Sequence, residues 1–262
     1  MKKQLTVFAI SCLCVISSLM AQQQPSLAEI LSSAYATIEK GVEQNNKGVL
    51  MQARATLEQA LNVNPENPYV LYAIGFAEYR ILCTSFASKD DALFGQLSDS
   101  IIVHAEKAGS DPRLKSDASA LLGSVYGMKI SKNWNDAPIL GPKSSRLLDE
   151  AVQADSLNPR AWFFTGVSQF STPEFFGGGK KKATASFDRA IRCAEAASSG
   201  DSLLPHWGLL DALIWGGRSA EANNDLAAAV AMYHRVLEHA PEYGWVKYVL
   251  LPDAEKKLAT AK

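Results

Sequence analysis

A recurring spacing of small and large apolar residues constrains the fold of this chain more than any other feature. Three segments carry a small residue, a large apolar residue and a second small residue at spacings of four and three. They are Ala53, Leu57 and Ala60; Ala183, Phe187 and Ala190; and Ala229, Tyr233 and Val236. Such spacing places the residues on one stripe of a helix. We therefore predict helices at these positions, with small residues that let a neighbouring helix come close.

Glycines ahead of these segments mark a partner helix in each case. Gly41 and Gly75 stand 34 residues apart, and each lies 12 residues before a small residue, Ala53 and Ala87. The pattern returns at Leu122-Gly123 with Tyr126, at Trp162 with Gly166, and at Gly217 with Ala229.

Together these motifs resemble the tetratricopeptide repeat (TPR), a helical hairpin of roughly 34 residues with the pattern W-x2-L-G-x2-Y, A-x3-F and P. The resemblance covers about residues 26–245. It implies an all-α, right-handed superhelix of about five TPR-like hairpins with a C-terminal capping helix. The segments around Asn133-Trp134, Asn158-Pro159 and Gly177 to Gly179 are also similar to exported bacterial TPR proteins.

Helix breakers divide the chain into the predicted elements. The breakers include Pro65, Asp111-Pro112, Gly141-Pro142, Asn158-Pro159 and Ala240-Pro241. Helices are expected over 26–45, 48–63, 67–84, 91–109, 113–131, 143–155, 159–171, 180–198, 204–222, 225–239 and 243–259. The last of these is the predicted cap, and Leu251-Pro252 is a place where it could bend.

The first residues predict export. Lys2 and Lys3 precede an uncharged apolar run, and Ala21 is followed by a polar segment, which is the order of a secretory signal. We predict a signal peptide over 1–21 and a TPR-like helical repeat domain over 22–262. The expected location is the periplasm, with no membrane insertion after the signal is removed. An uncleaved anchor, secretion and lipid attachment through Cys12 remain alternatives.

Composition narrows the functional classes. The 26 basic and 27 acidic residues nearly balance, so the chain offers no strong field for a phosphate backbone, and nucleic acid is not an expected partner. We found no catalytic constellation, no metal-ligand spacing among the four histidines, and no motif that calls for a cofactor. Cys83 and Cys193 are expected to be buried free thiols. The oligomeric state is not predicted.

The stretch from Gly177 to Lys182 departs from the phosphate-binding loop G-x-x-x-x-G-K-[ST], because Glu174 stands at the first glycine position and Lys181 at the last. We expect a flexible turn with solvated lysines there. The alternative is a helix start that holds an anion.

Binding is the predicted activity. In TPR stacks the first helix of each hairpin lines a concave groove, so the resemblance implies candidate groove-binding residues on those helices. They are Tyr69, Tyr72, Phe76, Tyr79, Arg160, Phe163, Phe170 and Arg218. Aromatic and arginine side chains suit a protein or peptide partner, although the same aromatics could simply pack between helices. A solute-binding accessory protein, with a small ligand between Trp134 and Phe175-Phe176, is the alternative.

Overall fold

The computed structural model describes residues 25–86, 90–197 and 200–261, and these residues form eleven α-helices and no β-strand. The predicted signal peptide, Cys12 and the predicted repeat residue Ala87 lie outside the described residues. Within the described ranges, no helix has the length and apolarity needed to cross a membrane.

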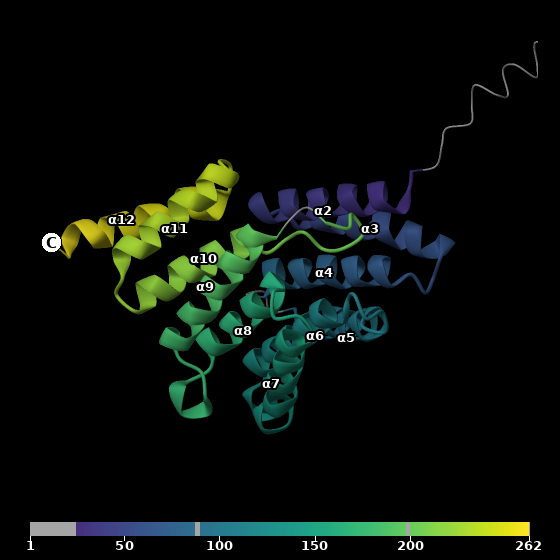
Figure 1. Ribbon diagram of the computed structural model, residues 1–262, viewed down its shortest axis with the longest axis horizontal. Helices are drawn as coiled ribbons and strands as arrows, with labels where there is room; N and C mark the ends of the chain where they lie inside the picture. The colour runs from purple at the N-terminus through teal and green to yellow at the C-terminus, as the bar shows by residue number, and fades with distance from the viewer. Residues whose placement is uncertain (1–24, 87–89, 198–199, 262) are drawn as a thin grey trace, which may run out of the picture.

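Successive helices pair into five hairpins that stack along the molecule, and a last helix packs on the fifth (Figure 1). The hairpins are α2 (Leu27–Glu43) with α3 (Lys47–Val63), α4 (Pro68–Ser85) with α5 (Asp91–Ala108), α6 (Lys115–Lys132) with α7 (Ala137–Ala154), α8 (Pro159–Ser171) with α9 (Lys180–Ala196), and α10 (Leu209–Ala222) with α11 (Leu226–His239). A π-helical turn (Val246–Leu250) then leads into α12 (Leu251–Thr260). The all-helical fold and the predicted number of hairpins are therefore confirmed.

Close contact between the repeated glycine and the large apolar residue explains the sequence repeat. In four hairpins, a Cβ added to the glycine would stand 2.8 Å or less from the partner side chain. The pairs are Gly41 with Leu50, Gly123 with Leu148, Gly166 with Phe187, and Gly217 with Tyr233. In the first hairpin the contacting residue is thus Leu50 and not Leu57, the large residue of the sequence repeat there. The large residues are almost wholly buried. The first helix thus needs glycine because the second helix lays a bulky side chain directly against its backbone.

The second hairpin departs from this pattern. Around Gly75 the nearest side-chain atoms, from His104 and Leu121, are 3.5 Å from the position of an added Cβ. That is ordinary contact, so the tight glycine packing is absent from this hairpin. This looser contact accounts for the weak repeat signal in the second helix of the pair.

Helix starts follow local signals. Asn67 and Asn158 each accept a hydrogen bond from the backbone N–H two residues later, and each is followed by a proline in the first turn. An N-cap asparagine satisfies donors that the helix leaves free, and proline is tolerated at the first helical position. These two starts lie within a residue of their predicted positions.

Two predicted boundaries were wrong. Gly141-Pro142 does not break the chain: α7 begins at Ala137 and contains Pro142. The missing proline N–H falls in the second turn, where it removes one intrahelical bond near an end. The helix predicted over 204–222 begins only at Leu209, because residues 200–208 run as an extended connection. The predicted bend near Leu251-Pro252 corresponds to the π-helical turn just before it.

The cysteine prediction holds in part. Cys83 and Cys193 are both free thiols, as expected, and Cys193 is buried. Cys83 is exposed, which corrects the expectation that both would be buried.

Candidate functional site

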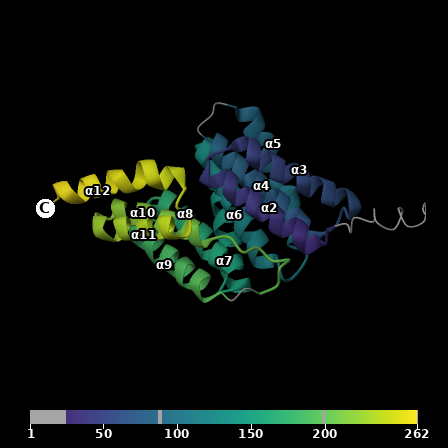
Figure 2. The same ribbon diagram turned by 90° about the horizontal axis from the view of Figure 1, so that it is seen from above.

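The connection between α9 and α10 crosses the face formed by the first helices of the hairpins. We call this the first-helix face; it receives side chains from α2, α4, α6, α8, α10 and the last helix from residue 243. Residues 200–208, here the crossing segment, run away from α9 toward α2 and α4 and return to α10 (Figures 1 and 2). Asp201 pairs with Arg113 at 3.1 Å, and the Trp207 carbonyl accepts a hydrogen bond from Arg160 at 3.4 Å.

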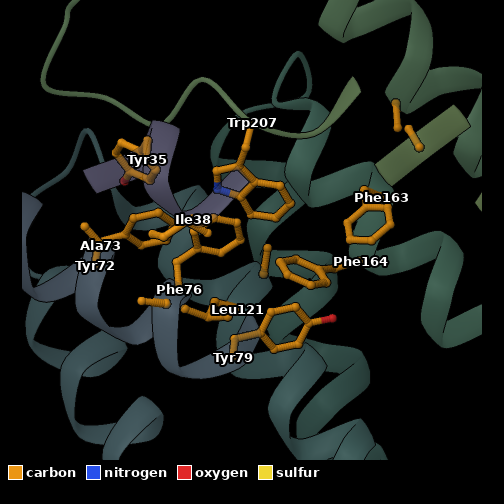
Figure 3. Close-up of a cluster of buried hydrophobic side chains, with 14 of the residues drawn as sticks. Tyr35, Ile38, Tyr72, Ala73, Phe76, Tyr79, Leu121, Phe163, Phe164 and Trp207 are labelled. Atoms are coloured by element: carbon orange, nitrogen blue, oxygen red, sulfur yellow. The ribbon is translucent and has the colours of Figure 1, made fainter. Parts of the chain in front are cut away.

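Trp207 anchors the crossing segment in an aromatic cluster (Figure 3). Its ring stacks on Phe76, with centroids 4.2 Å apart and planes inclined by 14°. Phe163 and Phe164 meet it edge-on, at 6.0 and 5.6 Å. Only 4% of Trp207 is exposed. The chain itself therefore fills the N-terminal half of the first-helix face.

Two buried ion pairs flank this cluster. Arg80 pairs with Asp211 and lies over the rings of Phe76 and Trp207, with its Cζ 4.9 and 5.2 Å from their centroids. Arg160 pairs with Asp117. Burial by itself lowers the pKa of each guanidinium, but the adjacent carboxylate outweighs burial and raises it above its ordinary value. Both arginines therefore stay charged, and each is paired with a carboxylate of the fold, although the buried Arg80 Nε has no hydrogen-bond partner among the described residues.

Most of the predicted groove residues lie in this interior. Tyr72, Phe76, Tyr79 and Phe163 are 6% exposed or less and gather around Trp207, so in this structure they offer almost no surface to a partner. These aromatics do lie together on the first-helix face, as their spacing predicted, but the crossing segment covers that part of the face. They form part of the core, which is the packing alternative noted for the aromatics.

The remaining predicted residues divide into two groups. Tyr69 is buried, donates a hydrogen bond to Asp111 at 2.9 Å and lies under the Arg113 guanidinium. Arg160 is held by Asp117, as described above. Phe170 and Arg218, by contrast, stay partly exposed in the C-terminal half of the face.

A row of cations and aromatic rings surrounds Phe170 and Arg218. The Phe170 and Trp215 rings meet edge-on at 5.6 Å. The Arg218 Cζ lies 4.2 Å from the Trp215 centroid and 5.4 Å from that of Trp245. Lys180 Nζ lies 3.4 Å from the Phe170 centroid. We call these five residues the cation–aromatic strip.

Sequence reasoning missed Trp207, Trp215 and Trp245 as members of these sites. A signal for Trp207 was present, since Pro205 and Gly208 bracket it in a connection longer than the other inter-hairpin links. Trp215 lies on α10, three residues before Arg218, and Trp245 lies at the start of the last helix, but both fall outside the repeat motif.

A small cleft lies beside Trp207, between the crossing segment and α2. Its volume is about 100 Å³, and its walls include Val42, Phe76, Arg80, His206 and Tyr243. Trp134, Phe175 and Phe176, which we expected to enclose a small ligand, do not line this cleft and are 62–91% exposed.

The glycine turn between α8 and α9 has a fixed conformation. Gly177 and Gly179 have φ values of 87° and 114°, and a Cβ on Gly178 would lie 2.0 Å from the Thr172 carbonyl oxygen. Lys180 donates to the Phe170 carbonyl and Lys182 to the Gly177 carbonyl. These two lysines are therefore tied to the backbone, which corrects the expectation that they would simply be solvated.

One cluster in the described chain contains the residue types of a catalytic triad. Glu78 is fully buried and accepts hydrogen bonds from Ser100 at 2.8 Å and Arg54 at 3.0 Å, with His104 Nδ1 also at 3.0 Å. The Ser100 hydroxyl donates to the carboxylate at 2.8 Å and lies 3.5 Å from His104 Nδ1, the nitrogen that itself faces Glu78. The cluster joins α3, α4 and α5. No group of three or more potential metal ligands occurs among the residues with described positions.

Comparisons with known proteins agree with this architecture. Neither protein-family profiles nor curated protein sequences give a match. Among solved structures, the HusA haemophore from Porphyromonas gingivalis is similar with a TM-score of 0.63 and 24% identity, over 76% of this chain and 96% of that one. TTC0263, a TPR protein in Thermus thermophilus, is similar with a TM-score of 0.55 and 16% identity, over 87% and 98%. The chain thus has a TPR-like fold of sequential helical hairpins.

Proposed function

We propose that this chain is a non-enzymatic binding protein of the bacterial cell envelope whose first-helix face takes a protein or peptide segment. The cation–aromatic strip is the observation that carries this proposal. It places Phe170 and Arg218, two of the residues expected in the groove, beside Trp215 and Trp245 on partly exposed surface. Tryptophan and arginine are the side chains that most often dominate the energy of protein interfaces.

The division of the first-helix face supports the same function. Its N-terminal half is covered by the crossing segment, whereas the C-terminal half has no such cover in the described chain. Trp245 is 40% exposed and Tyr248, three residues later, is 70% exposed. Large exposed aromatics that adjoin a stacked-helix face are typical of interaction surfaces. The predicted export signal supports the envelope as the place of action.

Site-specific photo-crosslinking in the native cell envelope tests this proposal. A photoreactive p-benzoylphenylalanine replaces Tyr248, which lies about one helical turn from Trp245. The matched control carries the same group at Met51, which is 52% exposed on α3. We expect one reproducible crosslinked protein from position 248 and none from position 51. Identical crosslinks from both positions, or none from 248, would contradict the proposal.

A second candidate function is binding of a small planar ligand at the cleft beside Trp207. The similarity to a haemophore favours it, as do the aromatic walls of the cleft and the presence of Arg80 and His206 there. The cleft volume of about 100 Å³ is below the roughly 300–1,000 Å³ of ligand pockets. A tetrapyrrole would fit only if the crossing segment moved away with Trp207.

Titration with haemin and with protoporphyrin IX separates the two functions. Small-ligand binding predicts a change in the ligand's visible absorption and a thermal stabilisation that follows mass action. Replacing His206 with Ala should weaken haemin binding, whereas replacing the exposed His234 should not. No spectral change and no thermal shift with either ligand would remove this candidate.

A further inference from the structure

Arg218 is a partly buried cation without an ion-pair partner among the described residues. It makes no ion pair and no hydrogen bond with any described residue, and its contacts are the rings of Phe170, Trp215 and Trp245. The acid nearest in sequence, Glu221, is already engaged by Lys257 at 2.9 Å and by the Tyr233 hydroxyl at 2.6 Å. Five guanidinium N–H donors are thus left for a partner.

Elsewhere on the same face, the arginines Arg80 and Arg160 are neutralised by acids of the chain itself. Each is paired with an aspartate, Asp211 and Asp117 respectively, and each lies beside Trp207. A partly buried charge is costly unless a hydrogen-bonded opposite charge accompanies it. The Arg218 site has the aromatic surroundings of the Arg80 site but lacks the carboxylate.

Lys180 adds a second cation to the strip. Its ammonium lies over Phe170 and donates one hydrogen bond to the Phe170 carbonyl, which leaves two N–H donors. Neither this lysine nor Arg218 has an acid within ion-pair distance among the described residues. Burial lowers the pKa of Lys180, and the charge of Arg218 lowers it further. The two groups therefore repel each other until an anion binds.

The strip is held in place before any ligand arrives. Ser219 follows Arg218 in α10, is fully buried, and donates to the Lys180 carbonyl at 3.1 Å. The hydroxyls of Ser219 and Thr184 lie 2.7 Å apart. These bonds tie the first turn of α9 to α10, so Lys180 and Arg218 keep their relative positions. A pre-formed site loses less entropy on binding.

The crossing segment shows that this face accepts an acidic side chain followed by an aromatic one. Asp201, at the start of a hydrogen-bonded turn, pairs with Arg113, and the Arg113 guanidinium lies 4.9 Å from the Tyr69 ring centroid. An acidic side chain therefore already meets a cation placed over an aromatic ring. Further along the same segment, Trp207 fills the neighbouring aromatic cluster. The strip repeats the cation and the rings, but none of the described connecting segments lies upon it.

We propose that the cation–aromatic strip binds carboxylate side chains of an extended acidic peptide segment in a partner protein. This inference rests on the proposed function and names the chemistry of the partner. Arginine meets a carboxylate with two parallel hydrogen bonds, and Lys180 is positioned to neutralise a second acid. The strip spreads over α8, α9, α10 and the start of the last helix, and each of its side chains is at least partly exposed, whereas small ligands are usually held in enclosed pockets. An extended peptide matches that shape.

NMR titration of the full-length protein tests the inference even for weak binding. The probe is a short peptide with blocked ends in which glutamate alternates with leucine, so that an extended backbone directs its acids to one side. The control peptide carries glutamine in place of glutamate. The reporters are the indole N–H signals of Trp215 and Trp245, with Trp134 as an exposed reference. We expect the glutamate peptide, and not the glutamine peptide, to shift the two strip signals.

Matched variants assign the effect to the cations. K180Q/R218Q should weaken binding by about 10-fold or more, because both charges are lost. Arg146→Gln, which removes an exposed cation from α7, should leave binding unchanged. Arg218→Lys keeps the charge and should retain part of the affinity, and circular dichroism checks that each variant folds.

Three results would overturn the inference: no shift of the strip signals by the glutamate peptide, equal shifts by the glutamine peptide, or unchanged affinity in K180Q/R218Q. Equal shifts by free glutarate at the same carboxylate concentration would assign the site to small carboxylates rather than to a peptide. A crosslinked partner at position 248 together with failure of the acidic peptide would leave the proposed function standing and remove only this inference.

Discussion

The two halves of the first-helix face contain the same kinds of side chain, aromatic rings and cations, but differ in burial and in charge pairing. Around Trp207, aromatic rings and arginines are buried, and the arginines Arg80 and Arg160 each have an aspartate. Around Trp215 the rings and cations are partly exposed, and no acid of the described chain pairs with Arg218. The difference lies in the crossing segment, which covers one half and leaves the other.

This contrast teaches that an aromatic and arginine-rich face is not in itself a binding site. Where the chain supplies its own cover, such residues stabilise the fold. Where no cover is present, the cations keep N–H donors on partly exposed surface and have no acid within ion-pair distance among the described residues, which is the property that a partner can use. Substitutions around Trp207 should therefore lower the free energy of unfolding much more than substitutions in the cation–aromatic strip.

Removing Trp207 should have the largest effect. Trp207→Ala deletes a nearly buried ring that stacks on Phe76, and such truncations cost about 3–5 kcal/mol of unfolding free energy. Trp245→Ala, in the exposed half, should cost about 0.5 kcal/mol or less. Urea unfolding followed by circular dichroism measures both. Equal losses in the two variants would mean that the halves do not differ as described.

Breaking a buried ion pair should come next. Asp117→Ala leaves the Arg160 guanidinium without its acid, and the loss of one partner of such a pair costs about 3 kcal/mol. The control is Glu195→Ala, which removes the partner of Arg235 from an exposed pair and should cost about 0.5 kcal/mol or less. If Asp117→Ala proved as mild as the control, Arg160 would have to be better hydrated than its packing indicates.

Replacing the unpaired Arg218 should lower the free energy of unfolding much less than replacing the paired Arg80. Arg218→Gln loses ring contacts but also relieves the burial of an unneutralised charge, so its net effect should be about 0.5 kcal/mol or less. Arg80→Gln leaves Asp211 without its partner and should cost about 3 kcal/mol. A large loss in Arg218→Gln would show that this arginine serves stability, and would weaken its assignment to binding.

The sequence predicted the hairpins because their cause is local. A glycine on one helix meets a bulky residue on the next helix, as Gly166 meets Phe187, and this contact recurs in four of the five hairpins. Asn67 and Asn158 signalled helix starts for the same reason, since a capping side chain acts within its own turn.

The sequence could not predict which half of the face is covered. Tyr72, Phe76 and Tyr79 have the spacing of a helix stripe, and that spacing is the same whether the stripe faces a partner or the protein's own chain. Their burial depends on Trp207, about 130 residues later, and no local rule gives the path of a connection over such a separation. Phe170 and Arg218 were predicted from the same kind of pattern and stay partly exposed, because the crossing segment does not cover them.

The smallest expected effect is on the pH dependence of stability. It compares Lys180, whose pKa is lowered in the folded state, with Lys257, whose pKa is raised. The pKa of Lys180 is lowered by burial and by Arg218, whereas hydrogen bonds from Lys257 to Asp253 and Glu221 raise the pKa of Lys257. A lowered folded pKa means that the folded chain releases its proton before the unfolded chain does. The unfolded state then binds more protons, so stability rises with pH up to the ordinary value of 10.5.

Unfolding of the wild type and of two glutamine variants between pH 8 and 10.5 measures these contributions by difference. The stability of the wild type relative to Lys180→Gln should increase with pH, because the charge of Lys180 opposes folding until it is lost. Relative to Lys257→Gln it should be positive and stay constant over this range, because the pKa of Lys257 is raised above 10.5 and its contribution is lost only at higher pH. A constant positive difference for Lys180 as well would mean that Lys180 has an acidic neighbour in solution, and that the strip is already neutralised before a partner binds.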